Sequence, residues 1–123
     1  MDKNAPVFIA VPTNDGRTIF PKMLGMAKYI CIYRIEDGTG FRFIEKRSNP
    51  FESTTQHLKT IDAYGVIRDC KIIIAALIGK KGIMRLEERG MKLFFRKGEI
   101  EEAVRSVLSE MESGSGSLQE GGK

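Results

Sequence analysis

Apolar and polar residues alternate with the two-residue period of β-strands in the first part of the chain. The run PVFIAVP at 6–12 is apolar and is followed by a turn signal. Residues 28–35 alternate, EDGTG at 36–40 predicts a turn, and FRFIEKR at 41–47 predicts the returning strand of an antiparallel hairpin. The side chains that we expect on one side of the second strand are Tyr29, Cys31 and Tyr33.

The period changes in the second half of the chain. Apolar residues recur every three positions and predict a helix over 54–67. CKIIIAAL at 70–77 is a continuous apolar run, which is typical of a strand covered on both faces. A helix over 79–90 that ends at a glycine, a strand over 91–95 and an amphipathic helix over 100–111 follow.

The expected order of elements is β-β-β-α-β-α-β-α. Crossover connections between parallel strands are right-handed and place their helices against the sheet. We therefore predict an α/β fold, with a mixed five-stranded sheet and helices on both faces. A single domain is expected over 1–112, and the Gly/Ser-rich stretch 113–123 is expected to be a disordered tail.

Composition and charge narrow the class of protein. The chain has 123 residues, 41% of them hydrophobic, and neither a bilayer-spanning apolar run nor a signal-peptide pattern is evident, so a cytoplasmic domain is expected. The two cysteines lie in separate apolar runs, which argues against a disulfide framework. The net charge of +4 favours anionic partners, but it is a weak sign of nucleic-acid binding.

The stretch IFPKMLGMAKYICIY at 19–33 contains three sulfur atoms. The thioethers of Met23 and Met26 and the thiol of Cys31 are ligands that suit soft metals. Methionine also fills gaps in protein cores, so packing is the alternative interpretation. His57 is the single histidine and is either a fourth ligand or a solvated residue of the first helix.

A second candidate lies at IGKKG, 78–82, where a buried strand meets a helix. Gly79, Lys80 and Lys81 could bind an anion at the helix N-terminus, or they could form an ordinary turn. No nucleotide-binding glycine motif is present. The acidic residues are scattered and no nucleophile elbow occurs, so we do not expect an enzyme.

Three segments together resemble the dinitrogenase iron–molybdenum cofactor biosynthesis family. They are IAVPTNDG, GMAKYICIYRIEDG and KIIIAALIGKKGIMRLEERGMKLFFRKGEIEEAV, and the resemblance extends over about residues 6–108. It implies a ribonuclease-H-like fold. It also implies proteins that bind, carry or help assemble iron–sulfur clusters containing molybdenum.

The family's loop before the Y-x-x-(I/V)-Y strand usually reads S-E-H-F-G-R-A, with its histidine a suspected cluster ligand. Here Met23 stands at the position of that histidine, while Gly25 is retained. By their charge, Lys22, Lys80 and Lys81 could neutralise an anionic cluster. The exchange of histidine for Met23 leaves open whether a cluster is bound.

Two hypotheses follow. The first is a non-catalytic carrier of an iron–molybdenum–sulfur cluster, or of copper or molybdenum, that exchanges its cargo with a donor or acceptor protein. The second is a metal-free interaction or regulatory module that binds an anionic partner, a nucleic acid or an acidic protein, through its basic surface. Neither hypothesis determines the oligomeric state.

Overall fold

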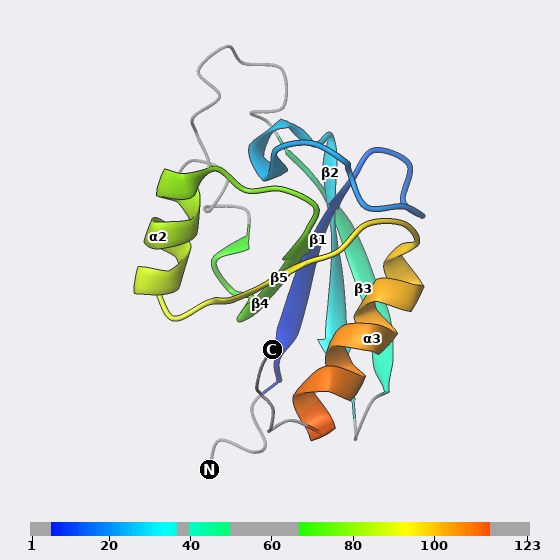
Figure 1. Cartoon of the computed structure of the whole chain (residues 1–123). Coiled ribbons are helices and arrows are strands. Elements are labelled where there is room, and N and C mark those ends of the chain that lie inside the picture. Colours follow the sequence, from blue (N-terminus) through cyan, green and yellow to red (C-terminus); the bar gives the residue numbers. More distant parts are fainter. Residues whose placement is uncertain (1–5, 37–39, 50–66, 114–123) are drawn as a thin grey trace.

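The computed structural model describes residues 6–36, 40–49 and 67–113, and its five strands form one sheet in the order β3-β2-β1-β4-β5 (Figure 1). The strands are β1 (Phe8–Thr13), β2 (Tyr29–Ile35), β3 (Phe41–Ser48), β4 (Ile72–Ala75) and β5 (Lys92–Phe95). The helices are the short 3-10 turn η2 (Leu24–Met26), α2 (Lys80–Glu88) and α3 (Ile100–Ser113).

Strand pairing makes the sheet mixed, as predicted. β2 pairs antiparallel with both β1 and β3, which confirms the hairpin. β4 pairs parallel with β1 and with β5. β1 is therefore the central strand and joins the antiparallel half of the sheet to the parallel half.

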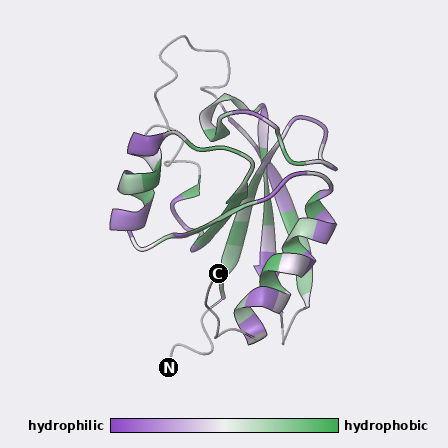
Figure 2. Ribbon diagram, in the orientation of Figure 1, coloured by the Kyte–Doolittle hydropathy of each residue, from purple (hydrophilic) through white to green (hydrophobic). Residues whose placement is uncertain are grey.

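The two faces of the sheet bury separate clusters, and each is covered by one of the described helices (Figures 1 and 2). The cluster under α3 contains Ile9, Val11, Cys31, Tyr33, Ile72, Ile74, Val104 and Val107, among others. The cluster under α2 contains Ala10, Leu24, Ile30, Ile32, Ile73, Ala75, Ile78 and Leu86, among others. The predicted alternation along β2 and the placement of helices on both faces are thus confirmed.

Gly90 follows the C-terminus of α2, where the sequence predicts that a glycine ends this helix. Gly90 has φ +84°, a left-handed conformation that residues with a Cβ rarely adopt. Its N–H donates to the carbonyl of Glu87 at 2.9 Å, and the N–H of Met91 donates to that of Leu86 at 3.1 Å. This pair of bonds is a Schellman motif, and it directs the chain into β5.

Parts of the sequence prediction lie outside the described residues. The helix expected over 54–67 is described only at Ile67, which is fully buried in the cluster under α2. The tail expected from residue 113 is likewise not described beyond that residue. Within the described ranges, none of the helices has the length and hydrophobicity needed to cross a membrane.

Candidate functional site

The carboxyl ends of β1 and β4 lie at the same edge of the sheet because the two strands are parallel. The chain leaves β1 into residues 14–28 and leaves β4 into residues 76–79 (Figure 1). We call these two connections, together with the start of α2 at Lys80 and Lys81, the loop edge. Ligands of α/β proteins commonly bind at the carboxyl ends of parallel strands, so this is the first place to look for a site.

Backbone contacts join the two connections of the loop edge. The N–H of Leu24 donates to the carbonyl of Leu77 at 3.0 Å, and Met23 and Leu77 form an isolated parallel bridge. The methyl carbon of Met23 comes so close to Gly79 that an added Cβ there would be 3.0 Å from it. The structure therefore brings together Met23 and Gly79, which the sequence analysis singled out independently.

Large apolar side chains, two of them with sulfur, are exposed at the loop edge. Met23, Met26 and Leu77 are 39%, 41% and 48% exposed, although large apolar side chains are usually buried. The neighbouring Leu24 and Gly25 are buried, and Leu24 anchors η2 in the cluster under α2. Two thioethers are thus presented to solvent by a turn whose middle is part of the core.

The loop edge is also basic. Lys22, Lys80 and Lys81 are exposed, and the last two form the start of α2, whose first turn has no acidic residue and whose N-cap has no side-chain hydrogen bond. The segments 16–35 and 70–86 contain no Asp or Glu at all. The dipole of α2 and the lysines therefore act in the same direction and favour an anion.

Asn49 holds the loop in place, and the sequence analysis missed this role. Its side chain, in a residue only 3% exposed, donates from Nδ2 to the carbonyls of Gly25 at 3.0 Å and Ala27 at 2.8 Å. Its own N–H donates to the carbonyl of Lys28. In the sequence the only sign was an asparagine before a proline, which predicts a turn and does not reveal the partner.

Polar side chains fasten the start of the same loop. One oxygen of Asp15 accepts the N–H groups of Arg17 and Thr18, both at 2.9 Å, and these bonds hold the pKa of its carboxyl well below the usual range. Asn14 accepts the N–H of Lys28 at 2.9 Å, which closes the loop across its base. The loop edge is therefore a preformed surface.

The remaining predicted ligands are placed differently. Cys31 is 1% exposed and lies in the cluster under α3, whereas Leu24 packs in the cluster on the opposite face. Burial raises the pKa of the Cys31 thiol and raises that of Cys70 to about 12. His57 lies outside the described residues.

The donors at the loop edge suit one kind of ligand. Within 6–36, 40–49 and 67–113 there is no group of three His, Cys, Asp or Glu residues that could hold a metal ion. The thioethers of Met23 and Met26, the lysine ammonium groups and the N–H groups at the start of α2 are what the edge offers. These groups can bind an anion that is rich in sulfur or oxygen. The lysines and N–H groups attract its negative charge, and the thioethers contact its soft atoms.

Solved structures share this fold. The structure of PH0822 superposes with a TM-score of 0.67 at 21% identity and covers 83% of this chain and 89% of that one. The apo form of the orange protein from Desulfovibrio gigas gives a TM-score of 0.59 at 19% identity, covering 87% and 88% of the two chains. A protein from Thermotoga, provisionally named NifB, gives 0.54 at 19%, covering 82% and 86%.

These identities establish the shared fold alone, and the ribonuclease-H-like assignment stays a prediction. A comparison with curated proteins finds no significant match. The family described as "Dinitrogenase iron-molybdenum cofactor" matches residues 5–110, which includes every described strand and nearly all of α3. The chain therefore belongs to the dinitrogenase iron–molybdenum cofactor family.

Proposed function

We propose that this protein is a non-catalytic carrier that binds an anionic metal–sulfur cluster, of the iron–molybdenum type or a related soft-metal type, at the loop edge and hands it to a partner protein. The observation that carries the proposal is the junction of Met23 with Leu77 and Gly79. It joins a soft-donor loop to a basic helix start on one exposed surface. Family membership and the absence of acid in both segments support it.

Each group has a distinct part in binding. Met23 and Met26 offer thioether sulfur, a soft ligand that needs no deprotonation. Lys22, Lys80 and Lys81 balance the negative charge of the cargo, and the N-terminus of α2 adds N–H donors. Thioethers are neutral, and a cluster held without thiolates at an exposed edge is easily released, which suits a carrier.

The test is uptake of a cluster by anaerobically purified protein. The protein is offered an isolated iron–molybdenum–sulfur cluster, or Cu(I) in a parallel sample, and bound metal is measured by elemental analysis and the visible spectrum. Met23→Leu with Met26→Leu preserves the apolar volume and removes both thioethers. Met84→Leu is the matched control, because Met84 is 60% exposed on α2 and lies outside the loop edge.

We expect stoichiometric uptake by the wild type and by the Met84→Leu variant, and loss of uptake in the double variant. Changing Lys80 and Lys81 to Gln should weaken uptake and reduce its dependence on salt, relative to Lys97→Gln, which removes an exposed charge elsewhere. No uptake by the wild type, or equal uptake by all variants, would contradict the proposal.

A second candidate function rests on the same lysines. The acid-free segments and the helix start would also bind an anionic protein without any metal. In that case the lysine variant loses its partner in a pull-down with metal chelators present, while the double methionine variant keeps it. Opposite behaviour of the two variants separates this interaction module from the carrier.

A further inference from the structure

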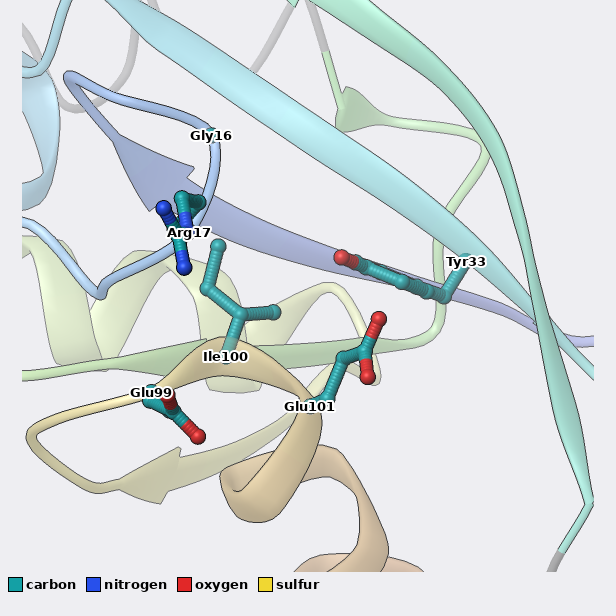
Figure 3. A pocket seen from close by; sticks show the side chains of 6 residues that line it. All are labelled: Gly16, Arg17, Tyr33, Glu99, Ile100 and Glu101. Atoms are coloured by element: carbon teal, nitrogen blue, oxygen red, sulfur yellow. The ribbon is translucent and has the colours of Figure 1, made fainter.

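A hollow lies on the α3 side of the sheet, whereas Leu24, next to Met23, packs on the opposite face. It has a volume of about 210 Å³. It lies where the turn after β1 meets the start of α3 (Figure 3). The residues that line it are Gly16, Arg17, Tyr33, Glu99, Ile100 and Glu101.

The walls of this hollow are fixed by backbone bonds. The N–H of Ile100 donates to the carbonyl of Arg17 at 2.9 Å, and the N–H of Ile19 donates to that of Gly98 at 2.8 Å. Thr18 and Glu99 form an antiparallel bridge between the same two segments. The hollow is thus built by two stretches of chain that are far apart in sequence and joined to each other.

The hydroxyl of Tyr33 points into the hollow (Figure 3). Tyr33 is only 4% exposed, and its ring packs edge-on against Phe41 and Phe43, with centroids at 5.8 and 5.5 Å. In the part of the chain that the structure describes, no residue hydrogen-bonds to this hydroxyl. The hydroxyl therefore hydrogen-bonds to whatever polar group occupies the hollow, water or a ligand.

The hydroxyl is available as a donor at neutral pH. Burial, with smaller contributions from Cys31 and Glu101, raises the pKa of Tyr33 to about 12. The phenol therefore keeps its proton over the physiological range. It can donate to an oxygen of a bound molecule and can also accept.

Three charged side chains frame the hollow. Arg17 lies on one side, and Glu99 and Glu101 lie on the other, with Glu101 extending towards Tyr33 (Figure 3). Within the described ranges none of the three forms an ion pair. Opposite charges therefore surround the hollow without neutralising one another.

Size and charge exclude most kinds of ligand. Drug-sized ligands and nucleotides occupy pockets of about 300–1,000 Å³, which is larger than this hollow. Two carboxylates disfavour a simple anion, and Arg17 weakens the attraction of the carboxylates for a simple cation. All three side chains are exposed to water, and a small zwitterion offers an opposite charge to both signs, which a neutral ligand does not.

We propose that this hollow binds a small zwitterion of the α-amino-acid type. The carboxylate of the ligand lies against the guanidinium of Arg17 and accepts the hydroxyl proton of Tyr33 in a hydrogen bond. Its ammonium group lies between Glu99 and Glu101. Gly16 and Arg17 belong to the loop edge, but none of the residues that line the hollow is among the groups proposed to bind the cluster, so the two sites are tested separately.

The test is an NMR titration of the full chain with each of the twenty standard L-amino acids. Acetate and methylammonium serve as probes that carry only one of the two charges. The variants are Tyr33→Phe, which keeps the ring contacts, and Arg17→Gln. Their controls are Tyr29→Phe, a tyrosine on the same side of β2, and Arg68→Gln, an exposed arginine elsewhere.

We expect at least one amino acid to shift the resonances of residues 16–17 and 99–101, and to bind more tightly than acetate or methylammonium. Tyr33→Phe and Arg17→Gln should each weaken that binding by about tenfold or more, since both bonds involve a charged partner. The control variants should bind as the wild type does. The variants' amide spectra show whether each protein is folded.

Three results would overturn the proposal. If no amino acid binds, the hollow contains only water and Tyr33 is hydrated. If methylammonium or acetate binds as tightly as the best amino acid, the site recognises one charge. If binding survives both Tyr33→Phe and Arg17→Gln, the ligand occupies another place. None of these results bears on cluster uptake, which is measured separately.

Discussion

The sulfur atoms of the loop edge and those of the sheet interior have opposite surroundings. Met23 and Met26 are 39% and 41% exposed, on a turn beside the basic start of α2. Cys31 and Cys70 are 1% and 2% exposed, in two different apolar clusters. All four sulfur atoms are soft, but the two pairs differ in burial and in chemistry, since the methionines are thioethers and the cysteines are thiols.

Burial has different consequences for a thiol and a thioether. A thiol binds metal as the thiolate, so a raised pKa removes it from use. Burial raises the pKa of Cys31 and that of Cys70, the latter to about 12, and both thiols are protonated at neutral pH. A thioether needs no deprotonation. For the proposed carrier function, the comparison therefore favours the methionines over the cysteines as soft donors.

The largest expected effect is protection of the buried thiols. In a Cys70→Ala variant, Cys31 should react with a thiol reagent at pH 8 at least about 1,000-fold more slowly in the native protein than in denaturant, since native stabilities are about 5–15 kcal/mol. The absorbance of the released chromophore measures both rates. If Cys31 of the native protein reacted as fast as it does in denaturant, the contrast between buried thiols and exposed thioethers would be contradicted.

A smaller effect is expected from Asn49, which supports the exposed thioethers from below. Asn49→Ala removes the donors to the carbonyls of Gly25 and Ala27 and should lower the free energy of unfolding by about 1–3 kcal/mol. Urea unfolding measures this change in the free energy of unfolding. Asn14→Ala is the control, because Asn14 is exposed and accepts one bond, from the N–H of Lys28.

We expect Asn14→Ala to cost less than Asn49→Ala. The Asn49→Ala variant should also lose cluster uptake in part while remaining folded, because the turn that presents Met23 is no longer held. An unchanged free energy of unfolding in Asn49→Ala would show that the loop is held by other contacts.

The local pattern of apolar and polar residues predicted the helices and strands well, because each of them depends mainly on residues that are close in sequence. The alternation along 28–35 correctly separated Cys31 and Tyr33 from the residues of the other face. Gly90 was recognised as the end of a helix, since a left-handed residue is needed there. The hairpin of β2 and β3 followed from the turn signal at 36–40, and the parallel part of the sheet followed from the crossover connections, whereas the central place of β1 was not predicted.

Long-range contacts in the site were beyond sequence reasoning. Nothing near Met23 indicates that its methyl group lies at Gly79, because that contact depends on how β1 and β4 are arranged in the sheet. Whether Cys31 and η2 lie on the same face of the sheet or on opposite faces depends on the same arrangement. The hollow at Tyr33 was missed because its charges come from two distant segments, each of which resembles an ordinary turn or helix start.

The smallest expected effect concerns the contact of Met23 with Gly79. Gly79 has φ −64° and ψ 156°, which alanine adopts without strain, and Gly79→Ala gains about 0.4–1 kcal/mol through the unfolded state. Gly79 is also the N-cap of α2, where alanine is less favourable than glycine by a similar amount, so these two effects nearly cancel. In the wild type the new Cβ would be 3.0 Å from the methyl carbon of Met23, and the flexible methionine must move. Gly79→Ala is therefore expected to cost more in the wild type than in a protein where Met23 is first shortened to alanine. A double-mutant cycle in urea should give a coupling of about 0.5 kcal/mol or more between the two positions. A coupling of zero would mean that Met23 does not lie over Gly79, and the loop edge would then lose the contact on which its proposed function rests.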